Sequence, residues 1–229
     1  MTVGMYFVVA IIGYFLGSVP FGLLISRIFA RTDIRQVGSG KIGMTNVMRT
    51  AGRKAGVLSL LLDMGKGALA VIFAGLIFGS ESISGGTPWV REGAQVLAAF
   101  SAIAGHSWSV FLKFKGGRGV ATFLGGLIAL YWPAALVGGI IMIIVGAISK
   151  YMSLGSITGA VSAFIMLIVL YMVRDYTSEY LLYTIYTMMC AIFIFLMHRD
   201  NINRLVSGTE RRLGDSAKAK TISSSHSLK

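Results

Sequence analysis

The chain has 229 residues, of which 55% are hydrophobic and only 13% charged, whereas soluble domains carry about 25% charged residues. This composition excludes an ordinary soluble domain and predicts an all-α integral membrane protein. The formal net charge is +12, but no basic domain lies outside the apolar segments, so loops facing anionic lipid explain it better than nucleic-acid binding. Cys190, which lies in an apolar run, is the only cysteine of the sequence, so an intrachain disulfide is excluded.

Seven apolar segments follow one another along the chain. They lie at about 4–29, 56–79, 93–112, 119–131, 133–149, 154–173 and 180–197. A spanning helix needs about 20 residues, and five of the segments approach or exceed that length. The fourth and fifth are shorter and meet at Trp132–Pro133, which is compatible with one kinked helix, two short spans or a re-entrant hairpin. The first is expected to be a span and not a cleaved signal peptide, because no Lys or Arg precedes it.

The distribution of Lys and Arg orients these segments. If the loop at 30–55 faces the cytoplasm and the chain crosses seven times, the outside loops hold only Arg91 and Arg174, as the positive-inside rule requires. Merging the fourth and fifth segments into one crossing would instead place Lys150 and the C-terminal cations outside, whereas a hairpin keeps the same parity. We therefore expect about seven transmembrane helices, an external N-terminus and a cytoplasmic C-terminus. The membrane domain would cover 1–214 and a disordered cytoplasmic tail 215–229.

The first of three polar, glycine-rich patches on the inner side is Gly38–Arg49, which reads GSGKIGMTNVMR. It matches G-x-G-x-x-G but follows an apolar helix, so a dinucleotide-binding fold is not predicted. The glycines alone fit a flexible turn. Combined with a hydroxyl, an amide and a guanidinium, they fit the binding of a phosphate. The candidate residues are Gly38, Ser39, Gly40, Gly43, Thr45, Asn46 and Arg49.

The second patch, Gly105–Thr122, contains the run Lys-Gly-Gly-Arg-Gly at 115–119. A basic turn that contacts lipid headgroups is the simpler interpretation. However, three glycines would let the backbone approach a ligand closely, and the apolar helix that follows would turn its N-terminus to the same compartment. The candidate residues are His106, Lys115, Gly116, Gly117, Arg118 and Gly119.

The third patch, His198–Glu210, begins where the last apolar segment ends. Cations that cap a helix C-terminus explain Arg199, but not the dense run HRDNINRL followed by Gly-Thr-Glu. Residues spaced by three share a helix face. The candidate residues are His198, Asn201, Arg204 and Glu210. Ser153, which joins the fifth and sixth segments on the same side, would add a hydroxyl to the site or cap a helix.

Asp63 and Lys66 lie inside the second apolar segment, where ionisable residues are costly and usually functional or paired. At positions i and i+3 they can pair with each other. The sequence has no His, Cys and carboxylate cluster with metal-ligand spacing and no G-x-S-x-G elbow. We therefore expect no metal, no cofactor and no covalent serine intermediate.

Together and in order, the three patches resemble the bacterial acyl-phosphate:glycerol-3-phosphate acyltransferase family. That family has GSGN-x-G-x-TN-x-x-R, then GH followed by F-K-GGKG-VAT, then HR-x-NI-x-RL-x-x-GTE. Lys41 and Arg118 stand where the family usually has Asn and Lys. The resemblance implies a seven-span protein of the bacterial plasma (inner) membrane. It would transfer a fatty acyl group from acyl phosphate to the 1-hydroxyl of sn-glycerol 3-phosphate, with its active site on the cytoplasmic face.

The partners implied are glycerol 3-phosphate, fatty acyl phosphate and membrane lipid, with no nucleic acid and no obligate protein partner. Either His198 or a phosphate oxygen of the substrate would take the hydroxyl proton. The residues expected to bind the two phosphate-bearing groups are Ser39, Arg49, Arg118, His198 and Asn201, with the glycines supplying backbone amides. A rival hypothesis is a transporter of a phosphorylated metabolite, motivated by Asp63 and Lys66. A non-catalytic scaffold would leave the three patches unexplained.

Overall fold

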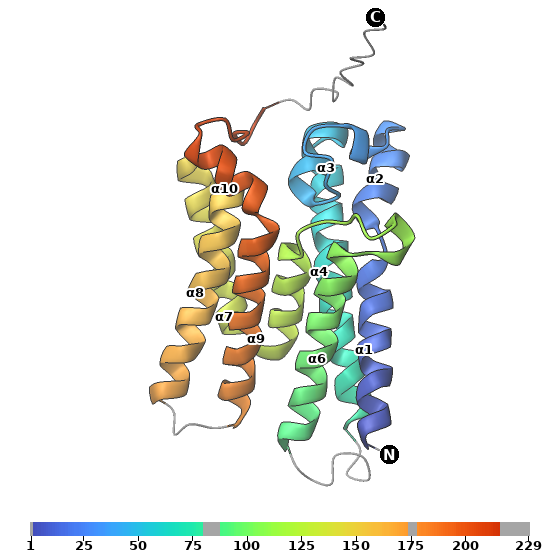
Figure 1. Cartoon of the computed structure of the whole chain (residues 1–229), viewed down its shortest axis with the longest axis vertical. Coiled ribbons are helices and arrows are strands. Elements are labelled where there is room, and N and C mark those ends of the chain that lie inside the picture. Colours follow the sequence, from blue (N-terminus) through green and yellow to red (C-terminus); the bar gives the residue numbers. More distant parts are fainter. Residues whose placement is uncertain (1, 80–87, 174–177, 216–229) are drawn as a thin grey trace, which may run out of the picture.

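The computed structural model describes residues 2–79, 88–173 and 178–215, and within these ranges its regular elements are all helices (Figure 1). They are α1 (Thr2–Ser18), α2 (Phe21–Ala30), η1 (Ile34–Gln36), α3 (Met44–Ala51), α4 (Arg53–Ile77), α6 (Pro88–Ser107), η2 (Val110–Leu112), α7 (Val120–Ser149), α8 (Met152–Val173), α9 (Ser178–Met197) and α10 (Arg199–Val206). Arg174 and all but the first residue of the expected tail lie outside the described residues.

Six helices of the described part are long and apolar enough to cross a membrane. The predicted helical membrane class is therefore confirmed, whereas the expected count of about seven spans is not. The fourth and fifth predicted segments form the single helix α7, which is interrupted at Tyr131 by non-helical backbone angles (φ −155°, ψ 88°). Pro133 follows two residues later. Proline has no N–H to donate to the preceding helical turn, and its ring clashes with a carbonyl oxygen of that turn.

The arm of α7 that precedes Tyr131 runs antiparallel to α9. At its start, Gly119 lies against Phe193, near the end of α9. At its other end, the ring of Tyr131 contacts the ring of Tyr180, near the start of α9, with centroids 5.7 Å apart. This arm therefore runs in the same direction as α8, because α8 and α9 are antiparallel neighbours (Figure 1).

The arm that follows Tyr131 runs the other way. Gly138 packs against Gly159 of α8, and Gly146 packs against Met152 at the start of α8, so this arm is antiparallel to α8. The two arms together form a hairpin, and both ends of α7 lie toward the same end of the bundle. Of the alternatives that the sequence left open, the structure shows two helical arms joined at a sharp bend.

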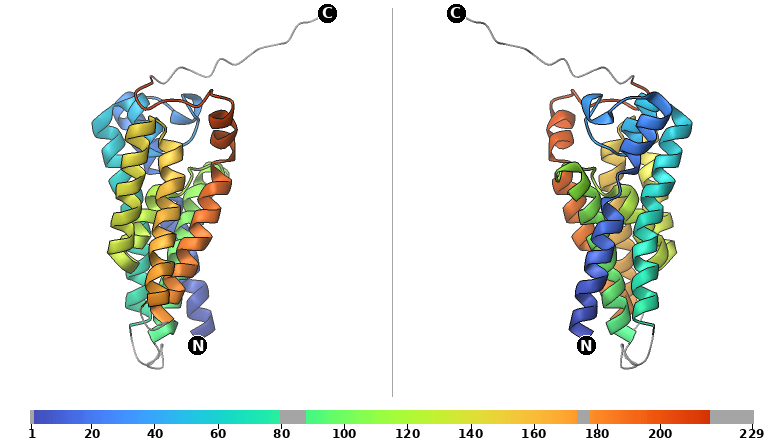
Figure 2. Two further views of the ribbon diagram at one scale, coloured as in Figure 1. Left: turned by 90° about the vertical axis from the view of Figure 1, so that its left-hand side faces the viewer. Right: turned by 90° about the vertical axis from the view of Figure 1, so that its right-hand side faces the viewer.

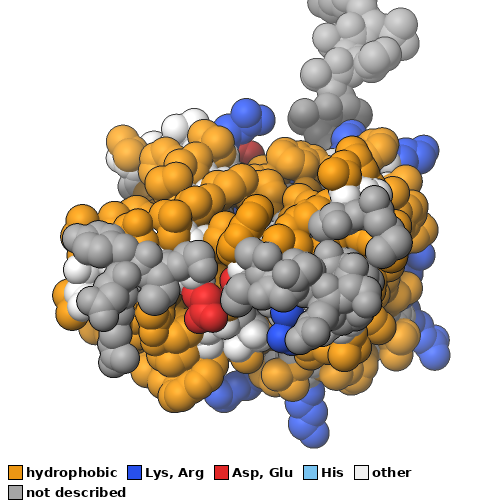
Figure 3. Space-filling view, turned by 90° about the horizontal axis from the view of Figure 1, so that it is seen from below, with side chains coloured by type: hydrophobic (Ala, Val, Ile, Leu, Met, Phe, Trp, Pro, Cys, Tyr) orange, Lys and Arg blue, Asp and Glu red, His pale blue; other side chains and the backbone are white. Residues whose placement is uncertain are grey.

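The three polar patches lie at one end of the bundle, opposite the N-terminus. Figure 1 shows α2, α3 and α10 at this end, and the two views of Figure 2 agree. The backbone N–H of Leu213 donates to the carbonyl of Lys150 (2.6 Å), which places the end of α7 here as well. Seen from the opposite end, the described surface is mostly hydrophobic, with a small group of acidic and basic side chains near its centre (Figure 3).

Glycines allow the first arm of α7 to approach α4 closely. A Cβ atom at Gly125 would overlap the backbone of Met64, so only glycine fits this contact. Membrane helices associate largely through such small residues, because the lipid gives no hydrophobic force between them. The contact brings the N-terminus of α7, at Gly119, near Asp63 of α4, and both residues line the cavity described next.

Candidate active site

A cavity of about 260 Å³ lies where the three polar patches meet. Its wall draws on α3, α4, α6, α7, α8 and α10 and on the loops between them. Twelve predicted residues line it: Ser39, Gly43, Thr45, Asn46, Arg49, His106, Arg118, Gly119, Ser153, His198, Asn201 and Glu210. Six do not: Gly38, Gly40, Lys115, Gly116, Gly117 and Arg204. All three patches therefore contribute to one site.

The buried amide of Asn46, on α3, shapes the first glycine loop. Its Nδ2 lies within 3.0–3.2 Å of the carbonyl oxygens of Ile34, Val37 and Lys41, and its Oδ1 accepts from the backbone N–H of Ser39 (3.2 Å). Every polar atom of this side chain is thus engaged with the loop. Asn46 lines the cavity, but its hydrogen bonds fold the loop around it.

Two glycines of the same loop make its turns. Gly38 (φ 58°) and Gly40 (φ 69°) adopt left-handed backbone angles, which glycine reaches without steric cost. The N–H of Gly40 donates to the carbonyl of Val37 (3.0 Å), so this amide is used within the loop. Gly43 instead precedes the first residue of α3 and lines the cavity directly.

The glycines of the second patch are also engaged within the fold. The N–H of Gly116 donates to the carbonyl of Ser107, and the N–H of Gly117 donates to the carbonyl of His106, both at 3.0 Å. The sequence suggested that these amides bind phosphate, whereas the structure uses them to fix the turn before Arg118. Lys115 is exposed and lies away from the cavity.

Two arginines bring unsatisfied positive charge to the cavity wall. The Nε atoms of Arg49 and Arg118 are buried and have no hydrogen-bond partner among the described residues. Burial lowers the pKa of both guanidinium groups, and that of Arg118, at about 10, still leaves it charged at neutral pH. Buried N–H donors on a cation fit an anion with several oxygens, such as a phosphate.

His198 presents one free ring nitrogen at the end of α9. Its Nδ1 lies 2.7 Å from the carbonyl oxygen of Ile194, which can only accept, so Nδ1 carries the hydrogen and Nε2 the lone pair. Burial and the charge of Arg118 lower the pKa of His198 to about 4. The imidazole is therefore neutral at neutral pH and able to accept a proton.

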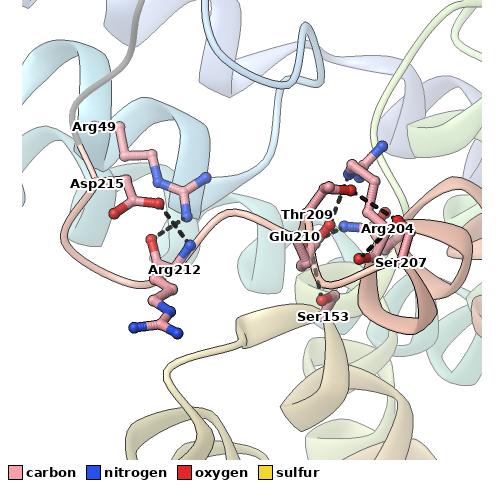
Figure 4. A network of polar contacts seen from close by, with 9 residues as sticks. Arg49, Ser153, Arg204, Ser207, Thr209, Glu210, Arg212 and Asp215 are labelled. Carbon is pink, nitrogen blue, oxygen red and sulfur yellow. Dashed lines mark hydrogen bonds and ion pairs between the residues drawn. The ribbon is translucent and has the colours of Figure 1, made fainter.

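Glu210 ties the third patch to the start of α8. Its Oε1 accepts from Ser153 Oγ (2.9 Å) and from Asn201 Nδ2, and its Oε2 pairs with Arg204 Nε (2.7 Å). Figure 4 shows Glu210 between Ser153 and Arg204. Arg204 thus supports the cavity from outside, through Glu210. The Oδ1 atom of Asn201 is buried without a hydrogen-bond partner among the described residues.

The segment that follows Glu210 crosses from α10 to α3 (Figure 4). Arg49 Nη2 donates to the carbonyl of Arg212 (2.8 Å), and the N–H of Arg212 donates to Asp215 Oδ2 (2.7 Å). Arg211, in the same segment, lines the cavity. No sequence motif indicated this crossing, because it depends on a contact between residues 163 positions apart.

The apolar part of the wall carries no signal in the local sequence. It is formed by Leu60, Val120, Ala121, Leu124, Met142, Ile143 and Met152. These residues come from α4, from both arms of α7 and from α8, so only the folded chain brings them together. The cavity therefore joins cationic donors to a hydrocarbon-lined surface. No cluster in the described part of the chain combines three or more His, Cys, Asp or Glu side chains that could hold a metal ion.

Comparisons with known proteins identify the family of this chain. Residues 7–208 match the family model described as glycerol-3-phosphate acyltransferase. The chain is 49% identical to glycerol-3-phosphate acyltransferase 3 of Dehalococcoides mccartyi, over 95% of this chain and all of that protein. It is 41% identical to the glycerol-3-phosphate acyltransferase of Cereibacter sphaeroides, over 90% of this chain and 89% of that protein.

A similar structure has also been solved. It is the crystal structure of PlsY (YgiH), an integral membrane glycerol 3-phosphate acyltransferase, in its glycerol 3-phosphate form. The TM-score is 0.76 and the identity 35%, over 91% of this chain and 96% of that one. A second crystal structure of PlsY, its lysophosphatidic acid form, gives a TM-score of 0.74 and 33% identity, over 90% of this chain and 94% of that one. The chain belongs to the glycerol-3-phosphate acyltransferase family.

Proposed function

We propose that the cavity transfers a fatty acyl group from acyl phosphate to the 1-hydroxyl of sn-glycerol 3-phosphate, giving lysophosphatidic acid and inorganic phosphate. One observation carries the proposal: the unpartnered guanidinium Nε atoms of Arg49 and Arg118 share a cavity with an apolar wall. Such a site fits a phosphate joined to a hydrocarbon chain. The family membership, and the glycerol 3-phosphate and lysophosphatidic acid forms of PlsY, support the same reaction.

The proposed reaction needs one base and a preorganised positive field. Nε2 of His198 takes the proton of the 1-hydroxyl while the oxygen attacks the acyl carbonyl carbon. The bond between the acyl carbon and the phosphate oxygen then breaks, and inorganic phosphate leaves. Arg49 and Arg118 stabilise the negative charge on the phosphate groups, and Asn201 helps to orient the acceptor. A phosphate oxygen of the substrate is the alternative base.

We further propose how the chain lies in the membrane. The cavity opens at the end that carries the 30–55 loop, which holds six Lys and Arg residues. The positive-inside rule then assigns this end to the cytoplasm and the N-terminus to the outside of a bacterial inner membrane. Counting the arms of α7 as two membrane segments gives seven, although each is short. Residues 1–214 would act as one catalytic domain, and 215–229 as a tail.

The transporter hypothesis receives less support. It requires a polar path toward the far end, but the described surface there is mostly hydrophobic (Figure 3). Asp63 and Lys66, which motivated it, pair with each other at 2.8 Å. The residues of the three polar patches gather at a single end, as expected of an enzyme that meets one substrate from water and the other from lipid.

The first experiment is to incubate the purified protein with palmitoyl phosphate and glycerol 3-phosphate and measure both products. Equal release of inorganic phosphate and lysophosphatidic acid, lost in Arg49→Ala, is the expected result. Arg53→Ala, an exposed cation at the start of α4, is the matched control and should retain activity. Turnover with acyl-CoA alone would reject acyl phosphate as the donor. Uptake of labelled glycerol 3-phosphate into proteoliposomes without any acyl product would reject the enzyme.

A further inference from the structure

Three ionisable side chains form a buried array, of which Asp63 and His106 reach the cavity wall. Asp63 and Lys66 project from α4 and His106 from α6, and each side chain is at most 3% exposed. Lys66 Nζ lies 2.8 Å from Asp63 Oδ1, and His106 Nδ1 lies 3.5 Å from the same oxygen. Charged groups at this depth are costly even when paired. The reaction proposed above assigns no step to any of the three.

Lys66 is fully engaged away from the substrate. Its ammonium also donates to the carbonyl of Val19 (3.0 Å), which lies in the short link between α1 and α2. It also lies 5.9 Å from the centre of the Phe21 ring. Lys66 is not part of the cavity wall. Its contacts therefore hold the carboxylate of Asp63 in place and leave it no reach to a phosphate.

His106 is held on both sides of its ring. Nδ1 lies 3.5 Å from Oδ1 of Asp63, a charge contact whose alignment is too poor for a hydrogen bond. Nε2 is covered by the backbone of Gly117, because a Cβ atom there would overlap it. The carbonyl of His106 accepts from the N–H of Gly117, and the carbonyl of Ser107 accepts from that of Gly116. With Nε2 covered, His106 is poorly placed to take a proton from a substrate.

We propose that this array positions Arg118. Asp63, anchored by Lys66, fixes the ring of His106. The ring and carbonyl of His106 together form the support on which Gly117 rests. Arg118 is the next residue along the chain, so the direction in which it enters the cavity depends on that support. The inference rests on the proposed function, in which Arg118 binds a phosphate-bearing substrate.

The chemistry of a guanidinium explains why such support matters here. A guanidinium is planar, and it binds two phosphate oxygens together only in one orientation, whereas an ammonium acts as a point charge on a flexible stem. A displacement of about 1 Å can cost about a hundredfold in rate. Loss of the array should therefore weaken the enzyme through Arg118 and leave the other cavity residues in place.

A double-mutant cycle tests the proposal. His106→Ala is expected to raise the KM for the substrate that Arg118 binds and to lower kcat/KM by about tenfold or more. In an Arg118→Lys background, the same substitution should lower kcat/KM only about two- to threefold, because an ammonium needs less orientation. Equal losses in the two backgrounds, or a loss in kcat with unchanged KM, would overturn the proposal.

Two further variants keep the result interpretable. Asp63→Asn combined with Lys66→Met removes both charges at once, so neither is left buried alone, and it should reproduce the His106→Ala result if that variant does not fold. Thr187→Val, equally buried but hydrogen-bonded only within α9, should lower thermal stability slightly and leave KM unchanged. Absence of wild-type turnover would instead reject the proposed function, which separates the two failures.

Discussion

Glu210→Gln is expected to lower kcat/KM by about 10- to 100-fold. The carboxylate accepts hydrogen bonds from Ser153, Asn201 and Arg204. A glutamine amide replaces one accepting oxygen with a donating NH2 group, so in either orientation a donor meets a donor. A hydrogen bond to a charged group contributes about 1.5–3 kcal/mol. At about 1.4 kcal/mol per tenfold, that loss corresponds to the stated range if it is expressed in the placement of Asn201.

The lower end of this range is the better guide. The Arg204 side chain is 29% exposed, so water screens its pairing with the carboxylate. Initial rates of lysophosphatidic acid formation, measured in detergent with both substrates varied, give kcat/KM. Ser207→Ala is the matched control, because it removes an exposed hydroxyl from the same segment. A Glu210→Gln enzyme that stays within twofold of wild type would refute the view that Glu210 orients Asn201.

Four other outcomes are expected. Because the pKa of His198 is about 4, the acid limb of kcat/KM against pH should fall near pH 4, and a midpoint near 6.5 would contradict this base. The pKa of His198 is lower in the folded state than in the unfolded state, so its contribution to the free energy of unfolding is present above pH 6.5 and is lost as the pH falls to about 4. Unfolding measured across this pH range should therefore depend less on pH in His198→Gln than in the wild type. Arg118→Lys should raise KM for its phosphate-bearing substrate about three- to tenfold in steady-state assays, and unchanged KM would exclude bidentate binding. Gly125→Ala should cost about 1–3 kcal/mol in a thermal unfolding assay by overlapping Met64, whereas Gly139→Ala, which meets open space, should not.

The site could be predicted from local sequence to a useful degree. Each polar patch contains its own signal, and eleven of the residues chosen from the patches line one cavity, together with Ser153. What the sequence could not show is how a residue divides its hydrogen bonds. Asn46 lies in the cavity wall, yet its amide bonds to the loop, and Gly116 and Gly117 give their N–H groups to carbonyls of α6. Such assignments depend on contacts between separate segments.

The membrane segments show the same division. Apolar length predicted helices at nearly the right positions, because it follows from the chain alone. The relation of the fourth to the fifth segment depended on packing, since it is the contacts of Tyr131 with α9 and of Gly138 with α8 that show the reversal. Asp63 and Lys66 were recognised as a pair, but their link to His106 was not, because it joins residues more than 40 positions apart.

The short first arm of α7 also bears on how the protein enters a membrane and where it works. Val120–Leu130 is about 16 Å long at about 1.5 Å per residue, roughly half of the about 30 Å hydrocarbon layer. It is too short to cross that layer alone, so the two arms would enter the membrane together as a hairpin. In Figure 1 the arm starts below the level of α3. If the end that carries α3 lies at the membrane surface, as proposed, glycerol 3-phosphate must enter the bundle to reach the start of this arm, whereas the acyl chain can stay in the hydrocarbon layer.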